Sequence, residues 1–341
     1  PDNGIKFFAH GGYKLPDQVE DQIQELLNTP WDRPTGAAVG EVEYDDDWAE
    51  KSYIEHLMTS LGTDLHGLRI AVDCANGGAS FLAPEAFRQA GADAVVINAA
   101  PDGRNINDKA GSTHPEQLQA LTVASEADFG VAYDGDADRC LAVDRDGNIV
   151  DGDKIMGALA VHMRDEGQLA KDTLVVTVMS NLGLILAMQE AGIQTVQTGV
   201  GDRYVLEAML EGGYSLGGEQ SGHIIAKKYA TTGDGILSSL LLARMVKESG
   251  RDLADLTSFI KRLPQTLINV GGVDRSRANT DPVVAEAVAA AEAVLGNTGR
   301  VLLRPSGTEP LVRVMVEAAT QAQADGVASR LADVVKENLS L

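Results

Sequence analysis

The stretch LRIAVD at residues 68–73 decides the fold class, because this apolar run leads into the small-residue turn NGGAS at residues 76–80. A helical segment then continues to about residue 91, and a second apolar run occupies residues 94–97. A strand, a crossover helix and a strand in this order form a βαβ unit with parallel strands. The sequence therefore predicts an α/β domain that begins near residue 68.

The pattern continues and then restarts further along the chain. An apolar run at 129–132 enters an acidic loop, a run at 141–143 follows, and Asp146-Gly147 predicts a hairpin turn. A second unit has predicted strands at 173–179 and 193–197 and predicted helices at 181–190 and about 202–210. No residue-by-residue repeat is visible, yet the order of elements favours a duplicated architecture.

The C-terminal part has a different order of elements, which predicts an α+β domain. Strands are expected at 265–270, 301–304 and 311–316, with helices at 283–295 and from about 321. A long apolar helix at 236–246 precedes this part. The acidic stretch from Glu41 to Glu50 contains no basic residue and is typical of a solvated linker.

These patterns predict a multi-domain α/β protein, with repeated α/β domains that contain mixed sheets and a C-terminal α+β domain. The expected domains are the end of an α/β domain with a linker (1–47), an α/β domain with the acidic loop (48–150), a second α/β domain (151–262) and the α+β domain (263–341).

Composition excludes several classes of protein. Asp and Glu (50) outnumber Lys and Arg (28), and the formal net charge is -22. A field of this sign repels nucleic acid and anionic lipid. The cysteines, Cys74 and Cys140, are too few for a disulfide framework, and the apolar runs fall far short of the roughly 18 residues of a membrane span. We expect a cytoplasmic protein with neither nucleic acid nor a membrane as a partner.

The acidic loop DGDADR at residues 134–139 is the sharpest chemical signal. Carboxylates at Asp134, Asp136 and Asp138 follow an apolar strand, and this spacing lets one loop direct three oxygen ligands at Mg²⁺ or Ca²⁺. An EF-hand is excluded because Arg139 stands where that loop needs glycine. Two alternative interpretations of the loop remain, namely the nucleophile loop of an aspartyl phosphatase and a solvated acidic turn. Arg139 either balances the negative charge of the acids or clamps a phosphoryl group.

Two further loops contain residues suited to a sugar phosphate. GGEQSGH at residues 217–223 offers mixed donors and acceptors between glycines, which suits a polyhydroxylated ligand, and His223 is a candidate acid or base. RPSGTEP at residues 304–310, with Arg313 behind it, offers hydroxyls and guanidinium groups for an anion. A glycine-rich hairpin and a polar turn are the structural alternatives.

In this order, the three loops resemble those of the α-D-phosphohexomutase superfamily, in particular its glucosamine branch. Residues 134–139 correspond to the metal loop, with Ala137 where the family generally has Gly, and Gln220 is typical of the glucosamine branch. Residues 111–116 and 200–205 also look like family segments. The resemblance implies four domains and the interconversion of glucosamine 6-phosphate and glucosamine 1-phosphate through a phosphoserine and a 1,6-bisphosphate.

The resemblance also implies the cofactors and the role of each site residue. Mg²⁺ is held by the metal ligands, a hexosamine phosphate is the substrate, and glucosamine or glucose 1,6-bisphosphate is an activator. The product feeds UDP-N-acetylglucosamine and cell-wall synthesis. The implied site consists of metal ligands Asp134, Asp136 and Asp138, catalytic residues Lys6, Arg139 and His223, and substrate-binding residues Glu219, Ser221, Arg304, Ser306, Gly307, Thr308 and Arg313, with Arg203 as a further contact.

The family's phosphorylated serine lies a few residues before the segment that corresponds to residues 2–6, and that loop is not in this sequence. We expect a truncated or cleaved chain that binds ligands without turnover unless its N-terminal fragment stays bound. The alternatives to this function are a phosphomannomutase, a phosphoglucomutase and a non-catalytic sugar-phosphate-binding protein. A homodimer is compatible with each of them.

Overall fold

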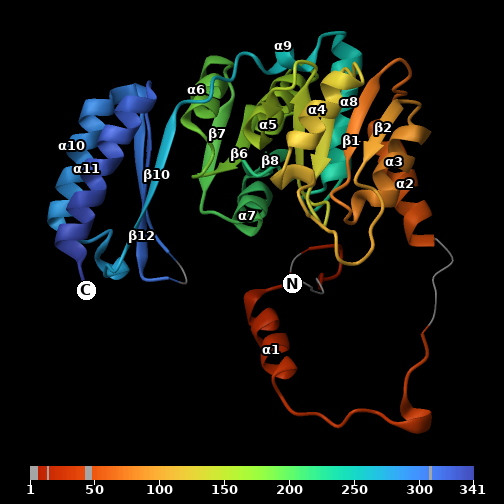
Figure 1. Cartoon of the computed structure of the whole chain (residues 1–341), viewed down its shortest axis with the longest axis horizontal. Coiled ribbons are helices and arrows are strands. Elements are labelled where there is room, and N and C mark those ends of the chain that lie inside the picture. Colours follow the sequence, from red (N-terminus) through yellow and green to blue (C-terminus); the bar gives the residue numbers. More distant parts are fainter. Residues whose placement is uncertain (1–6, 14, 43–47, 307–308) are drawn as a thin grey trace. The chain divides into compact units, whose positions relative to one another are not determined.

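The computed structural model describes residues 7–13, 15–42, 48–306 and 309–341 (Figure 1). The chain forms two compact units. The first unit comprises Pro1–Met179 and Gly192–Ser258, and the second comprises Ser180–Ala191 and Phe259–Leu341. Residues 180–191 are thus more densely packed with the C-terminal part than with the strands that flank them in sequence.

The first unit begins with a mixed sheet whose strand order is β2-β1-β3-β4-β5. Its strands are β1 (Arg69–Asp73), β2 (Asp93–Ile97), β3 (Phe129–Tyr133), β4 (Cys140–Asp144) and β5 (Ile149–Val150). β1 lies parallel to β2 and β3, whereas β4 and β5 are antiparallel additions. The structure confirms the predicted βαβ unit and the hairpin turn that follows it.

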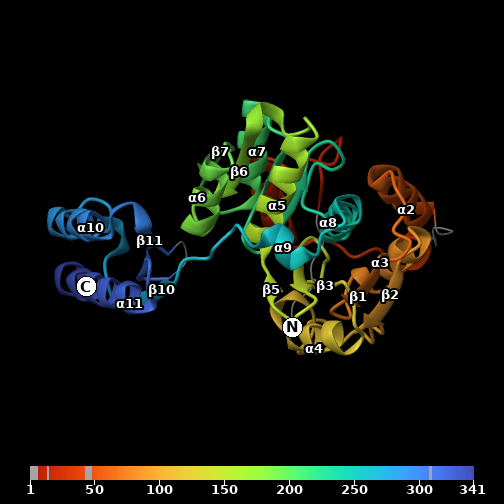
Figure 2. The same ribbon diagram turned by 90° about the horizontal axis from the view of Figure 1, so that it is seen from above.

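Helices cover both faces of this sheet (Figure 2). They are α2 (Trp48–Leu61), α3 (Ala79–Gln89), α4 (Glu116–Ala124) and α8 (Gly235–Ser249). Alternation along β3 explains the two faces, because Gly130 and Ala132 face α4, whereas the Tyr133 hydroxyl meets Ser239 of α8 at 2.7 Å. The acidic loop that follows Tyr133 is therefore anchored in a core that is packed from both sides.

The second sheet repeats this arrangement. Its order is β7-β6-β8-β9, with β6 parallel to β7 and β8 and with β9 antiparallel to β8. The strands are β6 (Thr173–Thr177), β7 (Gln194–Thr198), β8 (Leu216–Gly218) and β9 (Ile224–Ala226), and the helices of this region are α5 (Gly152–Asp165), α7 (Asp202–Gly212) and α9 (Leu253–Thr257). Each sheet thus has its first strand between its second and third, followed by an antiparallel fourth, which confirms the duplicated architecture.

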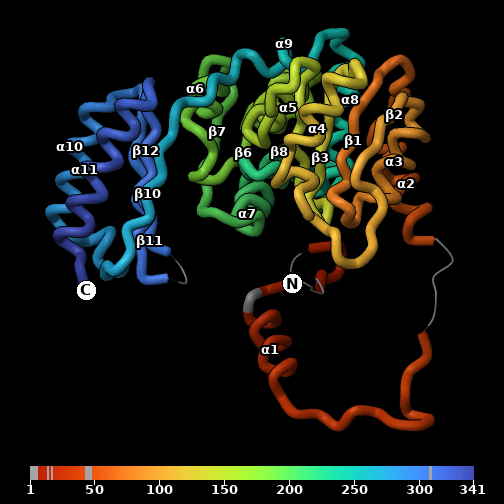
Figure 3. The backbone as a smooth tube through the Cα atoms, viewed as in Figure 1, coloured from red at the N-terminus to blue at the C-terminus, as the bar shows by residue number. Residues whose placement is uncertain are grey.

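The second unit contains an antiparallel sheet of order β10-β12-β11. The elements are β10 (Gln265–Gly271), β11 (Arg300–Pro305), β12 (Leu311–Glu317), α10 (Pro282–Leu295) and α11 (Gln321–Leu339). Figure 3 shows both helices on one side of the sheet, where valines of β12 and leucines of α11 share one hydrophobic core. This is the predicted α+β domain.

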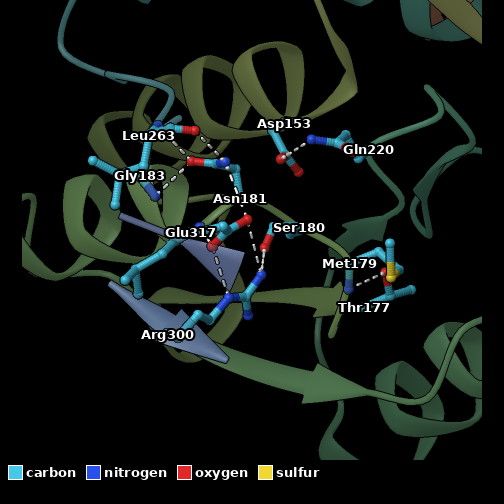
Figure 4. A network of polar contacts seen from close by, with 11 residues as sticks. Asp153, Thr177, Met179, Ser180, Asn181, Gly183, Gln220, Leu263, Arg300 and Glu317 are labelled. Atoms are coloured by element: carbon cyan, nitrogen blue, oxygen red, sulfur yellow. Dashed lines mark hydrogen bonds and ion pairs between the residues drawn. The ribbon is translucent and has the colours of Figure 1, made fainter. Parts of the chain in front are cut away.

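A buried polar network joins α6 (Leu182–Glu190) to the C-terminal sheet within this second unit (Figure 4). The Glu317 carboxylate is fully buried and accepts hydrogen bonds from Asn181 Nδ2 at 3.1 Å, from the Leu182 amide at 2.9 Å and from Arg300 Nε at 2.8 Å. The Asn181 side chain also bonds to both the amide and the carbonyl of Leu263. These contacts account for the grouping of α6 with the C-terminal residues.

The N-terminal region contains helix α1 (Asp17–Leu27). The expected acidic linker is shorter than predicted, because Glu50 lies in the first turn of α2 and Ile54, Leu57 and Leu61 of that helix are buried. Residues 43–47 of the linker lie outside the described residues. Across the described part of the chain, no helix has both the length and the apolar character that a membrane crossing needs.

Candidate active site

The metal loop, residues 134–139, forms the turn between β3 and β4. Asp134, Asp136 and Asp138 each contribute one carboxylate oxygen to a group whose members lie within 4.8 Å of one another. Asp134 is buried, Asp138 is half-buried and Asp136 is exposed. Three hard oxygen donors converging from one short loop form a donor set that suits Mg²⁺.

The backbone of this loop is held in a strained shape. Ala137 has a φ of +60°, a left-handed conformation that favours glycine and costs other residues about 1–2 kcal/mol. The Ala137 amide bonds to the Asp134 carbonyl at 3.1 Å, and its carbonyl accepts from the Gly235 amide at 2.9 Å. Gly77 also approaches the loop so closely that a Cβ there would lie 2.2 Å from the Gly135 carbonyl oxygen. Close backbone packing therefore fixes where the carboxylates point.

The electrostatics of the loop are those of a site with an excess of negative charge. Burial and the charges of Asp138 and Asp136 raise the pKa of Asp134 to about 6. The Arg139 amide, 3.2 Å from Asp134 Oδ1, and the Arg139 guanidinium oppose this rise. Arg139 Nε lies 3.7 Å from Asp134 and 3.8 Å from Asp138, with its side chain 46% exposed. The guanidinium is thus placed beside the acids and still reaches solvent.

The hairpin turn between β8 and β9 contains the sugar-loop residues. Its backbone packs on the start of β4, where the Cys140 amide donates to the Gly222 carbonyl at 3.1 Å. Gly222 has a φ of +93°, and a Cβ there would lie 2.2 Å from the Cys140 carbonyl oxygen, so only glycine fits. The metal loop and the sugar hairpin are therefore neighbours within one compact unit.

A cavity of about 310 Å³ separates the side chains of the two loops. Glu219, on its wall, accepts a hydrogen bond from the Gly201 amide at 3.0 Å. The Gln220 amide donates to the buried Asp153 carboxylate at 3.2 Å, as Figure 4 shows. The cavity is lined by Arg139, Thr177, Met179, Val200, Glu219, Gln220 and Ser221. The structure therefore brings Glu219, Ser221 and Arg139 to one hollow.

His223 is buried, and both of its ring nitrogens face protein groups. The Gly233 amide donates to Nε2 at 3.0 Å, so Nε2 acts as the acceptor and Nδ1 carries the proton. Nδ1 lies 3.5 Å from Asp138 Oδ2, and Nε2 lies 3.5 Å from Asp202 Oδ2. This geometry suits a histidine that orients the Asp138 carboxylate.

The second unit contains the predicted phosphate loop between β11 and β12. Arg304 and Arg313 are direct register partners on these antiparallel strands, so both side chains lie on the same face. Two guanidinium groups opposite each other are unfavourable unless an anion or a carbonyl group lies nearby. Ser306 is buried, and its hydroxyl accepts from the Glu309 amide at 3.3 Å. Gly307 and Thr308 lie outside the described residues, as does Lys6.

Two residues of these sites, Arg275 and Asp202, are not predicted from the sequence. Arg275 donates to the carbonyls of Ser306 and Glu309 and so supports the phosphate loop from outside its motif. Asp202 lies in the family-like segment 200–205, but its neighbour Arg203, the residue singled out there, pairs with Glu207 at 2.9 Å. An acid directly after the Gly201 turn is the signal that could have indicated Asp202.

Family models match most of the chain. The model described as phosphoglucomutase/phosphomannomutase, alpha/beta/alpha domain II, matches residues 51–147, and the corresponding domain III model matches residues 151–263. The model of the C-terminal domain of the same family matches residues 267–334.

Curated relatives and solved structures agree with these matches. The phosphoglucosamine mutase of Bifidobacterium longum subsp. infantis is 61% identical over 350 residues, which cover 100% of this chain and 76% of that protein. The phosphoglucosamine mutase of Streptomyces coelicolor is 58% identical over 344 residues, covering 99% of this chain and 76% of that protein.

Two solved structures share the fold at lower identity. A phosphoglucomutase/phosphomannomutase family protein from Burkholderia thailandensis superposes with a TM-score of 0.74 at 23% identity, covering 96% of this chain and 72% of that one. The N-acetylphosphoglucosamine mutase of Aspergillus fumigatus, in complex with GlcNAc-6P and magnesium, has a TM-score of 0.71 at 23% identity, covering 84% of this chain and 66% of that one.

Proposed function

The chain belongs to the phosphoglucomutase/phosphomannomutase family, and on this basis we propose that it acts as a phosphoglucosamine mutase. Such an enzyme interconverts glucosamine 6-phosphate and glucosamine 1-phosphate through a 1,6-bisphosphate. The relatives at 58–61% identity support this activity. The observation that carries the proposal is the convergence of three carboxylates beside a sugar-type hairpin within one compact unit.

Asp134, Asp136 and Asp138 are the proposed ligands of Mg²⁺. The fit rests on the three hard oxygen donors, whose oxygens lie within 4.8 Å of one another and whose negative charges a cation would balance. When bound, Mg²⁺ supplies electrostatic stabilisation of the charge on a transferring phosphoryl group. The solved Aspergillus fumigatus complex contains magnesium, and another structure of that enzyme contains glucose 1,6-bisphosphate, which supports Mg²⁺ and a bisphosphate activator here.

Arg139 is proposed to contact the phosphoryl group in transfer. Its guanidinium lies at the edge of the carboxylates and lines the cavity in front of the sugar hairpin. A planar guanidinium can donate two parallel hydrogen bonds to phosphate oxygens. Arg139 therefore balances the negative charge of Asp134 and Asp138 and also offers a directed contact to the reacting group.

Glu219 and Ser221 are proposed to bind sugar hydroxyls. The Gly201 amide holds Oε1 of Glu219, which fixes the orientation of the carboxylate and leaves its other oxygen for the ligand. Hydroxyls in the middle of the sugar stay in place when the ring turns over between the two phosphoryl transfers. One set of contacts can therefore serve both orientations of the bisphosphate.

The loop in the second unit is proposed to bind the phosphate that is not reacting. Arg304 and Arg313 share one face, and Ser306, Gly307 and Thr308 complete the motif. Charge-assisted hydrogen bonds to phosphate are about twice as strong as neutral ones, so this loop should supply much of the affinity for the ligand. A hexosamine phosphate is the substrate proposed on these grounds.

Proton transfer is assigned less directly. Lys6 remains a candidate from the family resemblance, and His223 would need to release its bond from Gly233 before Nε2 could accept a proton.

We also propose a division into functional domains at 48–150, 151–262 and 263–341. The compact grouping of residues 180–191 with the C-terminal part adds a mechanical link within the second unit.

Binding titrations test the proposal without depending on a phosphoryl donor. The protein should bind Mg²⁺ and glucosamine 6-phosphate, and Asp136→Asn should weaken Mg²⁺ binding about tenfold or more, because a hard ligand is replaced by a neutral amide. Asp146→Asn, at an exposed position in the next turn, is the matched control. Equal Mg²⁺ affinity for wild type and Asp136→Asn would refute the metal assignment.

A ligand series then separates this activity from its relatives. The affinities for glucosamine 6-phosphate, glucose 6-phosphate and mannose 6-phosphate are compared under the same conditions in the presence of Mg²⁺. A clear preference for glucose or mannose phosphate would overturn the glucosamine assignment and leave the family assignment intact.

A further inference from the structure

Three consecutive residues, Gly233, Asp234 and Gly235, connect the metal loop to the sugar hairpin. The Gly233 amide donates to His223 of the hairpin at 3.0 Å, and the Gly235 amide donates to the Ala137 carbonyl of the metal loop at 2.9 Å. The segment 233–235 directly precedes and enters helix α8. A movement of this segment would therefore reach both loops at once.

The contacts of the segment leave no room for a side chain at either glycine. A Cβ on Gly233 would lie 2.4 Å from His223 Nε2, and a Cβ on Gly235 would lie 2.4 Å from the Arg139 carbonyl oxygen. Since real Cβ atoms do not approach other atoms so closely, both glycines are needed for this packing. The segment thus acts as a tight spacer between the two loops.

Asp234 fixes the segment in place. It is the N-cap of α8, where its Oδ1 accepts from the Leu237 amide at 2.9 Å. The hydroxyl of Tyr53, on α2, lies 2.9 Å from Oδ1 and 2.8 Å from Oδ2 of the same carboxylate. Burial raises the pKa of the Tyr53 hydroxyl, so it remains protonated and donates this bond.

We propose that Tyr53 is a positioning residue for the metal loop, acting through Asp234 and the segment 233–235. The inference rests on the proposed function, in that the metal loop binds Mg²⁺. The Tyr53 hydroxyl bonds to Asp234, and Asp234 in turn sets the Gly235 bond to the strained Ala137 and the Gly233 bond to His223.

His223 connects the segment 233–235 to Asp138, one of the proposed metal ligands. Because Gly233 donates to Nε2, the ring is held as the tautomer whose Nδ1–H faces Asp138 Oδ2 at 3.5 Å. The other carboxylate that faces the ring is Asp202, 3.5 Å from Nε2. Loss of a partner that orients a metal ligand typically lowers metal affinity about 10- to 100-fold.

The test is Tyr53→Phe, which removes one hydroxyl and keeps the ring. Mg²⁺ titration at a temperature where the variant is fully folded should show a Kd raised about three- to tenfold, somewhat less than the loss of a direct outer-sphere partner. Tyr214→Phe is the matched control, since Tyr214 packs against a different core of the same unit and should bind Mg²⁺ as wild type does. A Kd for Tyr53→Phe within twofold of wild type would overturn the inference.

A second readout does not depend on the metal. Long-range ¹H–¹⁵N spectra report the tautomer of His223, and Tyr53→Phe should shift or broaden its ring nitrogen signals, whereas a purely structural role would lower the melting temperature and leave them unchanged. Asp234→Asn keeps a good N-cap but removes the charge and one of the two oxygens that face the Tyr53 hydroxyl, so it should change the Mg²⁺ Kd and the His223 signals in the same direction.

The two hypotheses fail in different ways. If wild type bound no Mg²⁺ in the loop, the proposed function would fall, and the His223 spectra would still decide whether Tyr53 positions the hairpin histidine. If wild type and Asp136→Asn behaved as proposed while both Tyr53→Phe and Asp234→Asn matched wild type in Kd and spectra, only the positioning role would fall.

Discussion

Replacing Asp134 by Asn should have opposite effects on stability and on metal binding. A pKa raised from 3.8 to about 6 means that the folded state holds the proton more tightly than the unfolded state does. As pH rises from about 4 to 6, the unfolded state loses its proton first, so the free energy of unfolding falls across this window. Above pH 6 the ionised carboxylate therefore destabilises the metal-free protein.

The size of this effect follows from the same pKa. A rise from 3.8 to about 6 corresponds to at most about 3 kcal/mol. The carboxylate retains some contact with solvent, which weakens the effect of burial, so we expect about 1 kcal/mol. Asp134→Asn removes the charge and keeps an oxygen that can accept from the Arg139 amide. The metal-free variant should then melt about 2–4 °C above wild type at pH 7.5.

Thermal unfolding in EDTA at pH 7.5 and at pH 4 measures the effect, with Asp146→Asn as the control for loss of an exposed acid. The gain should be present at pH 7.5 and absent at pH 4. In excess Mg²⁺ the order should reverse, because wild type gains stability from the bound ion and the variant does not. A metal-free variant that is less stable than wild type at pH 7.5, or a gain that persists at pH 4, would refute the reasoning.

Three other substitutions test separate parts of the structure. Arg304→Ala should weaken glucosamine 6-phosphate binding about tenfold or more and leave free glucosamine binding unchanged, because a charge-assisted hydrogen bond contributes roughly 1.5–3 kcal/mol; equal losses for both ligands in calorimetry would make Arg304 structural. Gly222→Ala should abolish glucosamine 6-phosphate binding by displacing the hairpin from Cys140; a variant with wild-type affinity for this ligand would contradict the packing. Asn181→Ala should lower the free energy of unfolding by about 1–3 kcal/mol, because the buried Glu317 loses a donor, and unchanged denaturant midpoints would count against this network.

The fold is predictable where burial gives a continuous pattern. β1 and β3 are buried on both faces, so their apolar runs stand out in sequence, and the Asp146-Gly147 turn identifies the antiparallel addition. Helix α2 escapes detection because acidic residues precede it and only part of one face, including Leu57 and Leu61, is buried. The grouping of α6 with the C-terminal sheet depends on side-chain hydrogen bonds between distant residues, which local patterns do not contain.

The site shows the same division between local and long-range information. Spacing alone identifies the three acids of the metal loop, because they converge within one turn. The contact of His223 with Asp138 joins residues far apart in sequence, and the bond from Gly233 that sets its tautomer is a backbone contact with no sequence signature. The sequence therefore shows which kinds of side chain form the site, whereas the tautomer and the contacts of each side chain depend on packing.

The metal loop and the sugar hairpin occupy corresponding turns of the two repeated sheets, each between a third strand and its antiparallel neighbour. They meet through backbone atoms, the Cys140 amide and the Gly222 carbonyl. Mutation can therefore exchange side chains in one turn without breaking the contact that aligns it with the other. Under the proposed function, such a duplicated module allows substitutions in the sugar hairpin to alter ligand preference while the carboxylates of the other turn stay in place, which gives the architecture a route to new substrates.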